Sequence, residues 1–350
     1  MGRFELMTVR GLACVALVAY HVVGPTQDNG MHLPLNSSWH LAMNSLDFLR
    51  MPMFTVLSGF LYASQRADSH SLPQFYRKKV NRLVLPLVFV TTIIFILRMR
   101  VYHDSTTYIE ALFFHYEHLW FVQALILIFA GMGAWDAFRR PSWVELCVAG
   151  FAAVMISRTF QITTFFSLNG ACYLLPFFVA GMILRMYRAQ LKTADLTTIA
   201  IAVVAIVILM QQASNAFGGN EISRTSVPAA LCGICGTYLM LVHCPRMRLA
   251  EFVGRYSYSI FLWHSVAASG ARHLLRAHTQ LPNAVEFSLL LAVGLYGPIL
   301  LHRLVGPVPI LSLLALGVRA SGRKPHHVAA ANATTHPAPA QISDVGRGRR

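Results

Sequence analysis

Long uncharged apolar runs follow one another along the chain and determine the architecture that we expect. Runs of about 18 residues with few charges are typical of helices that cross a bilayer. The alternating pattern of a membrane β-barrel is absent from the sequence. We therefore expect an all-α integral membrane protein with about ten transmembrane helices in one bundle. The predicted helices are 5–24, 45–63, 81–97, 118–135, 143–157, 171–187, 195–211, 227–243, 256–271 and 285–304.

The two ends of the chain differ from this pattern. The apolar piece 308–318 is too short to span a bilayer and is expected to lie at the interface. Beyond it the composition turns to Ala, Pro, His, Gly and Arg, which cannot bury a core. We expect a membrane-embedded domain over residues 1–318 and a disordered basic cytoplasmic tail over 319–350. The first apolar run lacks a clean cleavage site, so we interpret it as a retained helix and not a signal peptide.

Charge supports the membrane interpretation and suggests an orientation. Only 12% of the residues are charged, about half the fraction of an ordinary soluble protein. If the N-terminus is cytoplasmic, the cytoplasmic loops carry thirteen lysines and arginines and the opposite loops carry six. The positive-inside rule then places both termini in the cytoplasm. The net charge of +15 comes without a basic and aromatic nucleic-acid-binding module, so we expect no nucleic-acid partner.

The cysteines do not indicate a metal centre. Cys232 and Cys235 form a C-x-x-C pair inside an apolar run of small residues. A zinc site needs a second ligand pair at matching spacing, and the sequence has none. We expect these two side chains to pack between helices, and we expect no metal site.

Arg10 and His21 are the most unusual pair in the first predicted helix. Eleven residues separate them, almost three helical turns, so they share one helix face. His21 then lies roughly 16 Å along the axis from Arg10, well inside the apolar span. Ionisable groups at this depth usually face a protein interior or a wet cavity. We interpret them as a reaction path, with Arg10 at the cytoplasmic end and His21 toward the outer half.

The second predicted helix carries a polar pair and a small-residue pair. Asp47 and Arg50 are three residues apart and can pair on one helix face. Ser58 and Gly59 indicate a bend or a close approach of a neighbouring helix. A packing role explains Ser58 about as well as an active-site role does.

Four cations lie within six residues just before the third predicted helix. One interpretation is a positive-inside anchor that contacts anionic lipid. The other is a phosphate-binding site formed by Lys79 and Arg82, which are three apart on one helix face. Arginine binds phosphate through a bidentate fork and lysine as a point charge.

Two further histidines lie in apolar surroundings. His118 and Trp120 belong to a polar and aromatic cluster at the level expected for His21, where an aromatic belt with incidental histidines is an equal alternative. His264 lies inside the ninth predicted helix, shortly after Ser257. A lone buried histidine is commonly a packing residue, but His264 is the second intramembrane histidine of the chain after His21, and two of them favour a function.

The segments described above lie between residues 5 and 270. Taken in their order along the chain, they resemble the motifs of the acyltransferase-3 family of polytopic membrane O-acyltransferases. The Met-Pro-Met-Phe run at 51–54 is similar to a sugar O-acetylase branch of the family. The sequence departs from the family pattern at Met7, where an acidic residue is usual, at Lys79, where arginine is usual, and at His302-Arg303. The matching motifs are Arg10-x10-His21, Phe54 with Ser58-Gly59-Phe60, Lys79-x-x-Arg82 before Pro86, His118-Leu119-Trp120-Phe121, and Ser257 to His264.

The resemblance implies a reaction and a location. An acyl group, acetyl first of all, would move from cytoplasmic acyl-CoA to a sugar hydroxyl of a cell-surface or exported polysaccharide, or of its lipid-linked precursor. His21 would be the base, Arg10 would stabilise the donor, and Lys79 and Arg82 would hold the CoA phosphates. The membrane would be the bacterial inner (plasma) membrane, crossed many times. No bound cofactor is implied, because acyl-CoA is a substrate. Supporting roles fall to Ser58, His118, Trp120, Ser257 and His264.

Other functions remain open at the level of sequence. A transporter or flippase for a lipid-linked sugar or an acyl group also needs intramembrane ionisable residues and broken helices. A structural partner in a polysaccharide export assembly is a third interpretation. Within the acyltransferase interpretation, direct transfer with His21 as base and an acyl-histidine intermediate are both compatible with the residues. The acceptor sugar, the acyl group and the oligomeric state are not determined.

Overall fold

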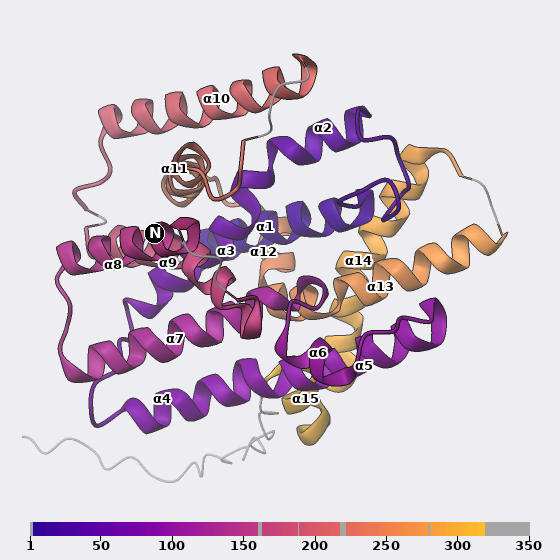
Figure 1. Cartoon of the computed structure of the whole chain (residues 1–350), viewed down its shortest axis with the longest axis horizontal. Helices are drawn as coiled ribbons and strands as arrows, with labels where there is room; N and C mark the ends of the chain where they lie inside the picture. The colour runs from indigo at the N-terminus through magenta and orange to yellow at the C-terminus, as the bar shows by residue number, and fades with distance from the viewer. Residues whose placement is uncertain (1–2, 160–162, 188, 218–221, 279–280, 319–350) are drawn as a thin grey trace, which may run out of the picture. The chain divides into compact units, whose positions relative to one another are not determined.

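The computed structural model describes residues 3–159, 163–187, 189–217, 222–278 and 281–318. Every regular element within these ranges is a helix (Figure 1). The tail predicted over 319–350 lies outside the described residues. One long helix overlaps each of the ten predicted segments: α1 (Arg3–Val23), α3 (Asp47–Tyr62), α5 (Leu85–Tyr102), α7 (Trp120–Phe138), α8 (Trp143–Thr159), α9 (Leu168–Met186), α10 (Ala194–Phe217), α11 (Val227–His243), α13 (Ser257–His278) and α14 (Asn283–Val305).

Shorter helices join these long ones. The apolar piece predicted over 308–318 forms α15, and His118, predicted to begin the fourth helix, lies instead in the 3-10 turn η2 before α7. Most of the remaining short elements fall outside the predicted segments, because they lack the long uncharged apolar run that marks a spanning helix. The short elements are α2 (Ser38–Ser45), α4 (Leu72–Lys79), the π-helix η1 (Val80–Val84), α6 (Tyr108–Phe113), η2 (Glu117–Leu119), η3 (Phe165–Ser167), α12 (Arg248–Arg255) and α15 (Pro309–Leu316).

The third helix is much longer than predicted. α4, η1 and α5 follow one another without a loop and form a span of 31 residues, Leu72–Tyr102 (Figure 1). The predicted start at residue 81 was wrong, because the apolar pattern marks only the part of a helix that needs an apolar environment. The polar first turns extend beyond it, and the basic cluster therefore lies on a helix and not in a loop.

Among the described residues, six helices are long and apolar enough to cross a membrane, or seven if α11 and α12, bent by 117°, count as one span. Large apolar side chains on α8 and α10 face outward, including Phe151 at 66% and Leu209 at 67% exposure. Side chains of this kind suit lipid better than water. The fold is that of an integral membrane protein, and ten crossings with cytoplasmic termini remain predictions.

Close helix crossings hold the central helices together. α1 packs against α2, α3, α11, α12, α13 and α14. At Gly11, beside Arg10, a Cβ would lie 1.8 Å from the Ala250 carbonyl oxygen of α12, and at Gly254 it would lie 1.9 Å from that of Met7. Only glycine allows backbones to approach this closely. These contacts fix the position of Arg10 along the α1 axis relative to α12.

The predicted close approach at Gly59 is confirmed. A Cβ at Gly59 of α3 would lie 1.9 Å from the Phe178 carbonyl oxygen of α9, and a Cβ at Gly181 of α9 would lie 2.0 Å from that of Val56. The two glycines form one reciprocal crossing. It positions the α3 face that carries Ser58.

Candidate functional site

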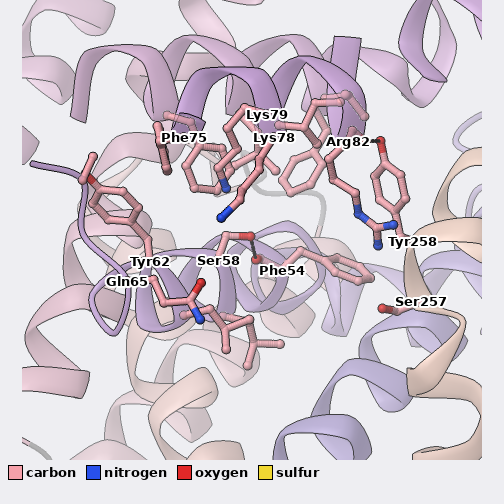
Figure 2. Close-up of a pocket in the computed structure, with 18 of the residues that line it drawn as sticks. Phe54, Ser58, Tyr62, Gln65, Phe75, Lys78, Lys79, Arg82, Ser257 and Tyr258 are labelled. Carbon is pink, nitrogen blue, oxygen red and sulfur yellow. Dashed lines mark hydrogen bonds between the residues drawn. The ribbon is translucent and has the colours of Figure 1, made fainter. Parts of the chain in front are cut away.

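Five cationic side chains line a cavity of about 680 Å³, and none of its described lining residues is acidic. We call it the basic cavity. α1, α3, α4, α7 and α13 contribute its walls. Figure 2 shows Lys78 and Lys79 extending from one helical segment toward Ser58 and Gln65 on the opposite wall, with Arg82 from the same segment beside Tyr258. The cations are Arg10, Arg66, Lys78, Lys79 and Arg82.

The structure brings the predicted phosphate-binding residues together with Arg10. Aromatic rings hold the two side chains: Lys79 Nζ lies 3.4 Å from the Phe129 ring centroid, and Arg82 Cζ lies 4.3 Å from that of Tyr258. Arg82 Nη1 also donates a hydrogen bond to the Leu316 carbonyl oxygen of α15 at 3.2 Å. Cation–π contacts and a neutral carbonyl orient these cations without neutralising them, which leaves their charge for a ligand.

Arg66 is the exception among the five cations. It pairs with Asp136 on α7, with Nε 3.0 Å from Oδ2, and the Tyr62 hydroxyl donates to the same carboxylate. Asp136 is completely buried. This network attaches the end of α3 to α7 and shapes one wall of the basic cavity. The pair was not predictable from the sequence, because the partners are 70 residues apart and neither lies in a local motif.

His21 lines a second cavity, of about 1160 Å³, which we call the histidine cavity. His118, Trp120 and Ser265 also line it. Arg10 and His21 therefore open into different cavities, although they share a face of α1. The predicted path is divided into two compartments. Ser58 and Ser257 belong to the basic cavity and Trp120 to the histidine cavity.

Three histidine rings from three parts of the chain meet here: His21 and His118 line the second cavity, and the completely buried His264 contacts both. The ring centroids of His21 and His264 are 4.9 Å apart, those of His118 and His264 are 4.7 Å apart, and those of His21 and His118 are 6.0 Å apart. Within the described residues, no group of three or more His, Cys, Asp or Glu side chains has the geometry to hold a metal ion. All three residues were identified from the sequence, but their mutual contact was not predicted. Their spacing along the chain does not determine the distances between side chains on different helices.

Hydrogen bonds assign the protons of two of these rings. His264 Nδ1 lies 2.9 Å from the carbonyl oxygens of Ile260 and Phe261, which only accept, so Nδ1 carries the proton. Its Nε2 is then a lone-pair acceptor, and it is buried with no partner in the described residues. His118 Nε2 likewise donates to the Leu262 carbonyl oxygen at 3.3 Å, while Nδ1 accepts from the Ser265 hydroxyl at 3.2 Å. Neutral imidazoles satisfy both sets of contacts.

A group of phenylalanines separates the two cavities. Phe261 lines both of them. Its ring centroid lies 5.2 Å from that of Phe121 and 6.0 Å from that of Phe54 on one side, and 5.5 Å from that of His118 on the other. The wall between the cationic groups and the histidines is therefore about one aromatic side chain thick.

Charged residues form the part of the histidine cavity beyond the three rings. Asp47 pairs with Arg50 of the same helix, as predicted, and also with Arg224, whose Nε lies 2.5 Å from Asp47 Oδ2. Arg98 pairs with Glu117 and, at 2.8 Å, with Asp104. In the loop after α5, hydrogen bonds from Thr106 and from Arg98 lower the pKa of Asp104 to about 2. Arg98 therefore has two carboxylate partners, whereas Asp47 is shared by two arginines.

Comparison with known proteins agrees with the motifs. The sequence profile of the acyltransferase-3 family, described as an acyltransferase domain, matches residues 4–303. A protein of Acidianus two-tailed virus named "Putative acetyltransferase ORF330" is 22% identical over 293 residues, which cover 74% of this chain and 82% of the viral protein. No solved structure matches the chain significantly. The profile match covers both cavities and all three histidines, and the chain therefore belongs to the acyltransferase-3 family.

Proposed function

We propose that this protein is a membrane O-acyltransferase that moves an acyl group, most simply acetyl, from cytoplasmic acyl-CoA to a sugar hydroxyl of a cell-surface or exported polysaccharide or of its lipid-linked precursor. The observation that carries the proposal is the pair of cavities that meet at Phe261. One offers cations for a polyanionic donor, and the other offers neutral histidines for an acceptor hydroxyl.

The basic cavity is the donor site in this proposal. Lys79 and Arg82 bind CoA phosphates, and Arg10 lies closer to the acyl end of the donor. Charge-assisted hydrogen bonds to phosphate are about twice as strong as neutral ones. The donor arm extends along α1 toward Phe261, so that the thioester reaches the wall between the cavities. This use explains why Lys79 and Arg82 are held by aromatic rings and not by carboxylates.

The histidine cavity is the acceptor site. His21 removes the proton from the sugar hydroxyl as its oxygen attacks the thioester carbon. A new C–O ester bond forms, the C–S bond breaks, and the CoA sulfur leaves and takes up a proton. His264, whose ring centroid is 4.9 Å from that of His21, presents an unprotonated Nε2 that orients the His21 ring or shares its proton. His118 and its Ser265 partner position the other two rings.

Mass spectrometry of surface polysaccharide tests the proposal. Cells with the gene, without it, and with His21→Ala are compared. We expect one acyl mass on one sugar to be absent in the second and third samples, with polymer amount unchanged. This result identifies the acyl group and the acceptor together. Unchanged acylation with less exported polymer contradicts the proposal and favours a transporter of the lipid-linked sugar.

A further inference from the structure

One carboxylate in the histidine cavity serves two arginines. Asp47 Oδ1 accepts from Arg50, and Oδ2 accepts from Arg224. Among the residues that the structure describes, no other carboxylate lies within ion-pair distance of either arginine. Asp47, Arg50 and Arg224 together therefore carry one net positive charge, and we call them the arginine group. Arg98, in the same cavity, differs because Asp104 and Glu117 both pair with it.

Arg50 is the more unusual member of this group. It is only 4% exposed, and its Nη1 is buried without a hydrogen-bond partner in the described part of the chain. Its guanidinium lies over the Tyr20 ring, with Cζ 3.5 Å from the ring centroid. A buried charged donor without a partner is strongly destabilising, so proteins retain such a group where a ligand satisfies it. Arg50 lines the histidine cavity, where a ligand can do so.

The group lies close to the proposed base. The Tyr20 ring is in contact with Arg50 on one side, and its centroid lies 5.1 Å from that of His21. Arg50 Cζ and the His21 ring are thus separated by no more than these two distances combined, a span that one or two sugar units can bridge. The Arg224 side chain is 58% exposed, which places it where the cavity meets solvent. An acceptor entering from that side meets Arg224 first and Arg50 next.

We infer that the acceptor carries an anionic group, the carboxylate of an acidic sugar or the phosphate of a lipid-linked one, which Arg50 and Arg224 bind while a nearby hydroxyl lies at His21. The inference rests on the proposed function, because it takes the histidine cavity as the acceptor site. Planar guanidinium groups bind carboxylates and phosphates through paired hydrogen bonds, which fixes orientation as well as affinity. The two arginines would then select which hydroxyl reaches the base.

Binding of three small probes tests the inference directly. The full-length protein in lipid nanodiscs is titrated with methyl glucoside, methyl glucuronoside and glucose 1-phosphate, and thermal stabilisation gives each Kd. We expect at least one anionic probe to bind about tenfold or more tighter than the neutral one. Tighter binding of methyl glucuronoside indicates an acidic sugar, and tighter binding of glucose 1-phosphate indicates a phosphate of a lipid-linked acceptor. Equal binding of all three probes, or tighter binding of the neutral one, overturns the inference.

Matched variants locate the binding. Arg224→Gln is expected to reduce the preference for the anionic probe about tenfold or more and to leave binding of methyl glucoside unchanged. Arg158→Gln is the control, because Arg158 is exposed on α8 and does not line the cavity. Arg50→Lys keeps the buried charge but removes the guanidinium group and its paired hydrogen bonds. The protein can therefore fold while its preference for the anionic probe falls. Full preference in both Arg224→Gln and Arg50→Lys contradicts the inference.

Transfer from labelled acetyl-CoA to the same probes separates the two proposals. An anionic preference in binding without any acetyl transfer leaves the anion site standing and counts against the proposed reaction. Acetyl transfer that favours the neutral probe supports the reaction and overturns the anion site. Transfer to an anionic probe that falls in Arg224→Gln but not in Arg158→Gln supports both.

Discussion

The His21 and His264 rings lie 4.9 Å apart, centroid to centroid, although 243 residues separate them in sequence. α1 supplies one ring and α13 the other. The His264 backbone contacts leave its Nε2 unprotonated and without a partner in the described residues, so a lone pair is held beside the proposed base. In the proposed reaction, this neighbour would stabilise the proton that His21 takes from the acceptor hydroxyl.

Replacement of His21 by alanine should abolish acyl transfer without preventing insertion. A positioned general base contributes about 10²- to 10⁴-fold to a rate, so kcat should fall by at least about 10²-fold. The measurement is acyl transfer by purified protein, with size-exclusion profiles as the check on folding. Near-normal transfer by a well-folded His21→Ala protein would exclude His21 as the base.

The double variant Lys79→Ala, Arg82→Ala should weaken donor binding more than catalysis. Each cation is expected to contribute a charge-assisted contact to phosphate, so the KM for acyl-CoA should rise about 10-fold or more while kcat changes less. Arg77→Ala is the matched control, since Arg77 is exposed on the same helix and lies outside the basic cavity. If the control and the double variant show the same KM, these residues contact lipid and not the donor.

The glycine crossing of α3 and α9 should be intolerant of a single methyl group. In Gly181→Ala the new Cβ would meet the Val56 carbonyl oxygen at 2.0 Å, which the backbones relieve only by separating. Such overpacking destabilises by about 1–3 kcal/mol. Thermal unfolding in nanodiscs measures it. Gly131→Ala is the control, because nothing lies within 4 Å of the position that its methyl group would take, and it should be neutral or slightly stabilising.

The buried network around Asp136 should contribute far more to the free energy of unfolding than an exposed ion pair does. Asp136→Asn leaves Arg66 without its carboxylate at a completely buried position, and breaking a buried pair costs about 3–5 kcal/mol. Glu145→Gln, which removes the partner of the largely exposed Arg139, should cost about 1 kcal/mol or less. Unfolding temperatures of the two variants give the comparison. Equal losses would mean that the Asp136 network does not join α3 to α7 as described.

Local patterns in the sequence predicted much of the fold. Apolar runs predict each long helix, because burial in lipid or protein requires an uninterrupted apolar surface. The Asp47–Arg50 pair and the close approach at Gly59 were also predictable, because spacing within one helix sets which side chains are neighbours. Lys79 and Arg82 were identified for the same reason. The 31-residue helix was not, because its first turns are polar and resemble a loop.

The sequence by itself determined the helical membrane architecture, the family motifs and the identity of the ionisable residues that lie in apolar surroundings. Only the tertiary structure decided how those residues combine: the meeting of His21, His118 and His264, the wall at Phe261 between the two cavities, and the sharing of Asp47 by Arg50 and Arg224. The physical reason is that helix periodicity is a local property of the backbone. Contacts between helices depend instead on close packing at glycines such as Gly11 and Gly181, which sets the height and rotation of each helix against the next.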